Sequence, residues 1–171
     1  DVLQTAQTLA GSIRGTAEAI EQAAELYDNR LGFVIDSVNE QFKAIAQLNE
    51  QIIQAGGGLK AGDLADQRDA ILTQVAQDTG VTAHFEADGT ATVFMGGHAV
   101  VSGGEAREMI YENPPGGSPA VYVSADDGRL PVTSSLGGTM GGHLQAHATV
   151  SGYSQDLDNF AQQFADAMNT Q

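Results

Sequence analysis

The sequence contains no cysteine and no tryptophan, and aromatic residues make up only 6% of its 171 residues. Without cysteine the chain has no disulfide bond, no thiol nucleophile and no thiolate zinc site. So few aromatic side chains argue against a ligand pocket with aromatic walls. No apolar run approaches the roughly 18 residues of a transmembrane helix, so we expect no membrane span.

Basic residues are also scarce, with seven Lys and Arg against 22 Asp and Glu, for a net charge of −15. A surface of this sign repels phosphate backbones and anionic lipid headgroups. We therefore expect neither a nucleic-acid partner nor a membrane partner. The acidic composition fits a secreted or cell-surface protein.

The composition divides the chain into three parts. Residues 1–55 contain three glycines and no proline, whereas residues 56–142 contain 17 of the 21 glycines and all four prolines. The remaining residues are again poor in glycine. This pattern predicts an α+β fold, with a helical rod over residues 1–79 and a β-rich lobe over residues 80–136. Residues 137–171 are predicted to form a Gly-rich connector and a return helix that packs on the rod as an antiparallel bundle.

Apolar residues in the first part follow two heptad series, with steps that alternate between four and three. The extra step of four between the series is a stutter, which unwinds a supercoil locally without ending the helix. We therefore favour one helix of about 50 residues over a hairpin that turns near residues 28–32. The two series are Val2, Ala6, Leu9, Ile13, Thr16, Ile20, Ala23 and Tyr27, then Leu31, Ile35, Val38, Phe42, Ile45, Asn49 and Ile52.

Glycine and aspartate mark the elements that follow. Residues 56–58 are all glycine and end the long helix, and Asp63 is a favourable N-cap for a second helix that stops at Gly80. Turn sequences at residues 87–89, 96–97 and 126–128 predict five or six short antiparallel strands. The return helix has its own apolar series at Ala146, Val150, Tyr153, Leu157, Phe160, Phe164 and Met168.

Three groups of residues are candidates for chemical sites. His143 and His147 have the i, i+4 spacing of metal ligands, but no third ligand accompanies them, so we interpret them as polar surface residues. The glycines of residues 137–142 lack the lysine of a phosphate loop and are interpreted as a connector that allows close backbone packing. We interpret Arg68 as a bridge to acids on a neighbouring helix. We expect no catalytic residue, no cofactor and no metal.

Several ordered motifs resemble the family of bacterial flagellar hook-associated protein 1, the hook–filament junction proteins. The first is I-A-Q-L-N-E-Q-I over residues 45–52, followed after a Gly-rich gap by D-L-A-D-Q-R-D over residues 63–69. The run G-G-T-M-G-G-H-L over residues 137–144 resembles a further family motif. The motif residues, which we expect to have structural roles, are Leu48, Asn49, Ile52, Asp63, Leu64, Asp66, Gln67, Arg68, Asp69, Gly138, Gly142 and Leu144.

The resemblance implies a non-enzymatic assembly subunit that contacts other copies of itself, the hook protein and the next junction protein. It also implies export through the flagellar secretion route to an extracellular position at the hook–filament junction. We expect this chain to be a central fragment of a longer protein, and we expect the isolated fragment to be monomeric. The alternative is a cell-surface adhesin or antigen module with a helical stalk and a β head.

Overall fold

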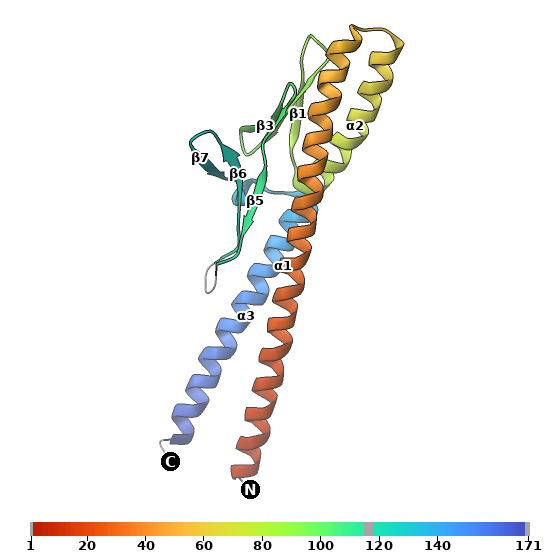
Figure 1. Ribbon diagram of the computed structural model, residues 1–171. Helices are drawn as coiled ribbons and strands as arrows, with labels where there is room; N and C mark the ends of the chain where they lie inside the picture. The colour runs from red at the N-terminus through yellow and green to blue at the C-terminus, as the bar shows by residue number, and fades with distance from the viewer. Residues whose placement is uncertain (1, 115–117, 170–171) are drawn as a thin grey trace.

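A computed structural model describes residues 2–114 and 118–169, without the side chains of Val2 and Leu3. Helix α1 (Val2–Ala55) is a single helix of 54 residues, which confirms the preference for one helix over a hairpin. Helix α3 (Gly138–Asn169) runs antiparallel to its first half, and the two ends of the chain lie at the same pole of the rod (Figure 1). Helix α2 (Leu59–Thr79) folds back on the other half of α1. The α+β fold class is confirmed.

The two heptad series of α1 have different surroundings. All seven members of the second series are buried, because α2, the strands and the start of α3 cover that half of the helix. The described members of the first series are only half-buried, or exposed in the case of Thr16, because this half of α1 packs mainly against α3 (Figure 1). The side chain of Val2 lies outside the described residues. The hydrophobic core therefore lies at the end of the rod that is distant from the termini.

The reversal between α1 and α2 is shorter than the sequence predicts. Gly56, Gly57 and Gly58 have φ values of 64°, 96° and 79°, a left-handed region that glycine adopts at little cost. The chain turns within these three residues, and α2 begins at once with Leu59. The prediction of Asp63 as N-cap was therefore wrong, since Asp63 lies within α2. The predicted stop is confirmed: Gly80 has φ 76°, and its N–H donates to the carbonyl of Ala76 at 2.8 Å.

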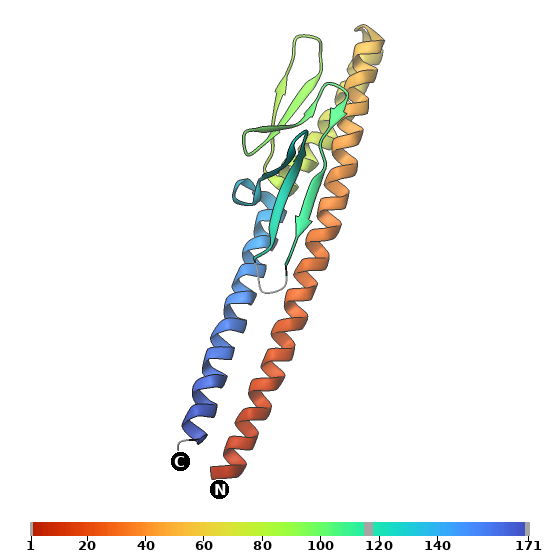
Figure 2. The ribbon, with the colours of Figure 1, turned by 60° about the vertical axis from the view of Figure 1, so that its left-hand side comes forward.

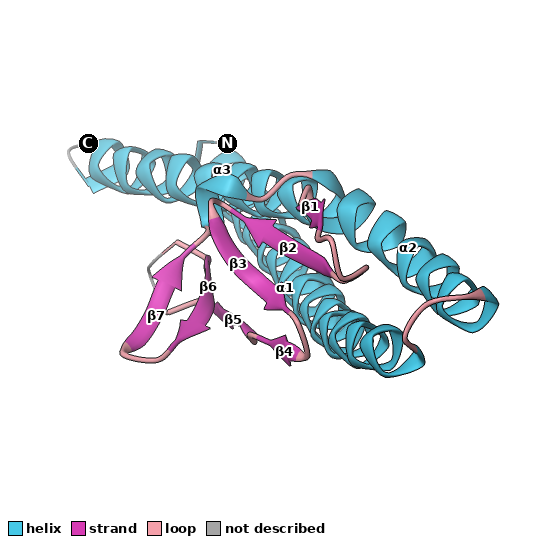
Figure 3. Cartoon of the chain, turned by 90° about the horizontal axis from the view of Figure 1, so that it is seen from above, coloured by secondary structure: helices cyan, strands magenta, loops and turns pink. Residues whose placement is uncertain are grey.

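The strands form two small antiparallel sheets beside α1 (Figures 2 and 3). The first sheet has the order β1-β2-β3-β4, with strands Thr82–Phe85, Ala91–Met95, His98–Ser102 and Glu105–Ala106. The second has the order β5-β6-β7, with strands Met109–Glu112, Ala120–Ala125 and Gly128–Pro131. The three predicted turns are present, but the short β4 raises the strand count above five or six. Residues 115–117 of the predicted Pro/Gly loop lie outside the described residues.

The return helix differs from its predicted form at its start and on its apolar face. After the short helical turn η1 (Thr133–Ser135), α3 begins at Gly138, so the predicted Gly-rich connector forms the first turns of the helix. Met140, Leu144 and His147 are the buried residues of α3. Tyr153 and Phe160, which were predicted to face the rod, are 60% and 49% exposed. The apolar series of α3 is therefore wider than the face that α1 covers.

Candidate functional site

Asn49 forms the most heavily bonded polar contact between α1 and the first sheet. Its Nδ2 donates to the carbonyls of Ala91 and Gly103, both at 2.9 Å, and its Oδ1 accepts the N–H of Ala91 at 2.9 Å. The side chain is fully buried. A buried amide that satisfies donor and acceptor together fixes the position of the sheet, because any shift leaves unpaired polar groups. This motif residue therefore connects α1 to strand β2.

Asn39 makes the equivalent contact with the second sheet, and sequence reasoning missed it. Its Nδ2 donates to the carbonyl of Met109 at 3.0 Å, and its Oδ1 accepts the N–H of Met109 at 2.7 Å. Asn39 is 9% exposed. Asn39 directly follows Val38 of the heptad series. This position beside the seam was the only signal in the sequence that the amide could be buried. Each sheet is thus attached to α1 by one asparagine amide.

Arg68 on α2 is 2% exposed and holds the β1–β2 turn. Its Nη1 donates to the carbonyl of Gly89 at 2.6 Å, and its Nη2 lies 2.9 Å from Oδ1 of Asp69. The guanidinium also lies over the ring of Phe85, 5.2 Å from its centroid. The expectation of a bridge to acids on another helix was wrong, because the acid is the next residue of the same helix.

The other residues of the two helical motifs divide between packing and solvent. Ile52 is buried, and a Cβ at Gly89 would lie 3.2 Å from its Cγ2, so the β1–β2 turn passes close to this end of α1. Leu48 and Leu64 are half-buried. Asp63, Asp66 and Gln67 are exposed, and Gln67 donates to the carbonyl of Asp63 at 3.2 Å. The structure brings Asn49 and Arg68 together, with Nη1 of Arg68 3.5 Å from Oδ1 of Asn49, but leaves these exposed residues outside the contact.

The glycine motif at the start of α3 makes a close approach between backbones. Gly138 has φ 57°, and a Cβ there would overlap the carbonyl oxygen of Gln77 at the end of α2. Gly142 has open space around it. Leu144 is buried in the core. The close packing predicted for this motif is therefore present at Gly138 and absent at Gly142.

Asp28, at the stutter of α1, joins three elements through one carboxylate. Its Oδ1 accepts the hydroxyl of Tyr111 at 2.6 Å and lies 3.1 Å from Nε2 of His147, and its Oδ2 accepts Nδ2 of Asn113 at 2.6 Å. Burial, followed by the bond to Asp28, raises the pKa of the Tyr111 hydroxyl. His147 is 3% exposed, so its interpretation as a surface residue was wrong.

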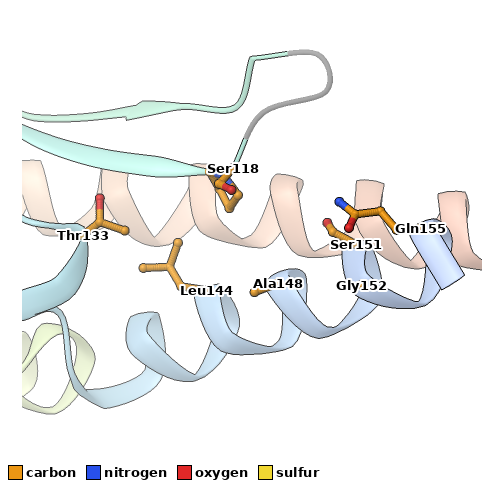
Figure 4. Close-up of a pocket in the computed structure, with 8 residues that line it drawn as sticks. Ser118, Thr133, Leu144, Ala148, Ser151, Gly152 and Gln155 are labelled. Atoms are coloured by element: carbon orange, nitrogen blue, oxygen red, sulfur yellow. The ribbon is translucent and has the colours of Figure 1, made fainter.

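A cavity of about 340 Å³ lies between α3 and the start of β6 (Figure 4). Its described lining consists of small hydroxyl, amide and alkyl groups without a charge. The hydroxyl of Thr133 already bonds to both the N–H and the carbonyl of Val121. Across residues 2–114 and 118–169, no three His, Asp or Glu side chains form a group that could hold a metal. Nor is any helix of the described chain both long and apolar enough to span a membrane.

Comparisons with known proteins agree on one family. All residues 1–171 match the family model of the flagellar hook-associated protein FlgK helical domain. Flagellar hook-associated protein 1 of Escherichia coli K12 is 31% identical over 157 residues, which are 82% of this chain and 28% of that protein. The protein of the same name from Salmonella typhimurium is 28% identical over 182 residues, covering 97% of this chain and 32% of that protein.

A solved structure has the same fold. The flagellar hook junction protein FlgK from Burkholderia pseudomallei superimposes with a TM-score of 0.72 at 28% sequence identity. The match covers 84% of this chain and 27% of that one. The chain thus spans about a third or less of the length of the relatives that it matches.

Proposed function

The chain belongs to the flagellar hook-associated protein FlgK family, and from this membership we propose that it is a structural part of the junction between the flagellar hook and the filament. The observation that carries the proposal is the match of the family's helical domain to every residue of the chain. The role is mechanical: the chain positions a lobe relative to a rod. It has no catalytic step.

The connections between rod and lobe support this role. Asn39 and Asn49 attach one sheet each to α1, and Arg68 attaches the β1–β2 turn to α2. The contacts are buried and geometrically specific, as a subunit requires if it is to transmit force without changing shape. We propose that residues 1–79 and 137–171 act as the rod and residues 80–136 as the lobe. The motif residues Asn49, Arg68 and Gly138 have structural roles in this arrangement.

The position of the termini supports the proposed partners. The chain enters and leaves at one pole of the rod, and the lobe lies toward the other pole (Figure 1). Further segments of a longer subunit at that pole would lie next to one another, where they are available to pack in an axial structure. The proposed partners are other copies of the subunit, the hook protein and the next junction protein. The proposed location is the outside of the cell, reached through the flagellar secretion route.

Deletion and localisation test the proposal directly. The gene is deleted in the source bacterium, and a tagged copy of the complete protein is located by immunogold electron microscopy. We expect hooks without attached filaments in the deletion strain, loss of swimming, and gold label at the hook–filament boundary in the complemented strain. Normal filaments in the deletion strain would refute the proposal. Nothing observed favours the adhesin alternative, which predicts normal swimming and reduced attachment to surfaces.

A further inference from the structure

The half of the rod nearer to the termini has two flanks that differ in their side chains. In α1 the heptad positions beside the seam hold Ala10, Ala17 and Ala24 on one side, and Thr5, Ser12, Ala19 and Leu26 on the other. A two-stranded coiled coil normally has charged residues at these flanking positions. Small or apolar residues there widen the apolar face, which is typical of a helix that contacts more than one partner. The structure supplies one partner, α3.

One flank is a ridge of large apolar side chains. Leu26 and Phe33 are seven residues apart on α1 and are 50% and 74% exposed. Tyr153 and Phe160 are seven residues apart on α3 and are 60% and 49% exposed. Residues seven apart lie almost in line along a helix. We call Leu26, Phe33, Tyr153 and Phe160 the ridge.

The other flank is a groove of about 390 Å³ between α1 and α3. Its apolar lining includes Ala10, Ile13, Ala161 and Ala165. At about 100° per residue, Leu26 lies about 160° around α1 from Ala10, and Phe160 lies about 140° around α3 from Ala165. The ridge and the groove are therefore on opposite sides of the helix pair. The volume of the groove is within the range of small-molecule pockets, so one aromatic side chain fits within it.

The charges beside the two features are complementary. Arg14 lines the groove and is the only lysine or arginine in residues 1–29 and 131–171. Asp156 is exposed and lies three residues after Tyr153 and four before Phe160, on the same face of α3 as the ridge. If Phe160 of one copy entered the groove of another, Asp156 would approach Arg14.

We propose that the ridge of one copy of this chain packs into the groove of the next copy, with Asp156 of the first paired to Arg14 of the second. The inference rests on the proposed function, because it assigns the contact between neighbouring subunits of the junction. Different surfaces meet in this contact, so it is heterologous, and such contacts generate closed rings or helical arrays. A two-fold dimer would instead pair ridge with ridge.

The size of the ridge favours an assembled structure over a free dimer. A large side chain has a surface of about 150–250 Å². The four ridge residues are between 49% and 74% exposed, so together they expose on the order of 500 Å². A stable interface buries about 800 Å² on each partner. Copies that each carry a charge of −15 also repel one another. The contact therefore forms where other segments already hold the subunits together.

Cross-linking in the complete protein tests the contact. Cysteine is introduced as Phe160→Cys, as Ala165→Cys and as both together, and flagella isolated from the complemented deletion strain are treated with a short bis-maleimide. We expect a ladder of dimers, trimers and longer products from the double variant and no ladder from either single variant. Dimers as the main product of Phe160→Cys alone would overturn the proposal in favour of a two-fold contact.

Charge reversal provides an independent measurement in the same background. Arg14→Glu and Asp156→Arg each place like charges together, so each is expected to reduce the ladder roughly tenfold. The two substitutions together restore an opposite pair and are expected to recover most of the ladder. A double reversal that is no better than the single ones would refute the Arg14–Asp156 pair.

The location of the protein separates this inference from the proposed function. Gold label at the hook–filament boundary without a ladder from the double cysteine variant would overturn the ridge–groove contact and leave the junction role intact. Normal swimming and filaments in the deletion strain would overturn the junction role itself. A ladder together with label at the boundary supports both.

Discussion

The side-chain amide of Asn49 forms with the backbone of Ala91 the two hydrogen bonds that a neighbouring β-strand would form, one donated and one accepted, both at 2.9 Å. Asn39 forms the same pair of bonds with Met109, at 3.0 and 2.7 Å. Ala91 begins β2 and Met109 begins β5. At Ala91 and at Met109 an asparagine of α1 thus takes the place of a neighbouring strand for one residue, which fixes both sheets along α1.

Replacement of either asparagine by alanine is expected to destabilise the fold. Asn49→Ala leaves the N–H of Ala91 and the carbonyls of Ala91 and Gly103 without their partner in a buried site, at a cost of about 2–3 kcal/mol. Asn39→Ala leaves one N–H and one carbonyl unpaired and is expected to cost about 1–2 kcal/mol. The measurement is the free energy of unfolding of the 171-residue chain in urea.

Gln47→Ala is the matched control, because Gln47 is an exposed amide on the same helix. Its free energy of unfolding is expected to stay within about 0.5 kcal/mol of the parent. An Asn49→Ala variant as stable as Gln47→Ala would show that water replaces the lost bonds, contrary to the role assigned to Asn49.

The heptad pattern predicted one long helix, because apolar spacing depends only on local sequence, but it did not show that the second series alone would be fully buried. The same pattern set Asn49 in the seam but gave no sign of its partners. Its bonds reach residues 42 and 54 positions away, and such pairs are decided by the packing of the sheets. Asp28 was missed, and His147 was wrongly placed on the surface, for a related reason. From the sequence, each is a polar residue on the surface of a helix. Only the packing of a second element against that helix covers it.

The start of α2 could not be predicted from its capping residue. Asp63 is a better N-cap than any residue before it, yet Gly58 and Leu59 begin the helix. Three successive glycines reverse the chain in the shortest available distance, and the early start lengthens the contact between α2 and α1. Packing against α1 thus outweighed the preference of one side chain, which is worth only about 1 kcal/mol. Tyr153 and Phe160 show the converse: they belong to the predicted apolar series of α3, but the rest of the described chain leaves them 60% and 49% exposed.

Arg68→Lys is expected to destabilise the chain although it keeps the positive charge. A lysine ammonium cannot contact Gly89, Asp69 and the face of Phe85 together, because it lacks the planar, forked guanidinium. The expected loss is about 2 kcal/mol, since Asp69 remains partly solvated and the carbonyl of Gly89 loses its donor. Urea denaturation measures this loss, and Lys43→Arg, at an exposed site of α1, is the control. Equal stability of Arg68→Lys and the parent would contradict the argument.

Ionisation of Tyr111 is expected to lower stability at high pH. Burial and the hydrogen bond to Asp28 raise the pKa of this tyrosine above its usual value of 10.0. Above about pH 10 the unfolded chain releases the proton while the folded chain retains it. The unfolded state then binds fewer protons, so the free energy of unfolding falls as pH rises through this range. Below about pH 10 both states keep the proton, and this contribution to pH dependence vanishes.

Tyr111→Phe and Asp28→Asn separate the causes. Between about pH 10 and 11.5 the free energy of unfolding should fall less steeply in Tyr111→Phe than in the parent. Asp28→Asn should lower the pKa of Tyr111 only in part, because burial is the larger cause. The ultraviolet titration of tyrosine, taken as the difference between each protein and its Tyr111→Phe counterpart, measures this pKa. A Tyr111 pKa unaffected by Asp28→Asn would contradict the assigned bond.

Two glycines of one motif should respond in opposite ways to the same substitution. Gly138→Ala places a methyl group within 2.8 Å of the carbonyl carbons of Gln77 and Asp78, at a residue whose φ of 57° disfavours any side chain. Neither backbone can move without separating α2 from α3, so the expected loss is about 3 kcal/mol or more. Gly142 is four residues later in the same helix and has nothing within 4 Å of its Cβ position. Alanine there should be neutral or stabilising by up to about 1 kcal/mol, because it raises helix propensity. Urea denaturation of the two variants tests whether the fold requires glycine at Gly138 alone. Equal losses in the free energy of unfolding at both positions would contradict this.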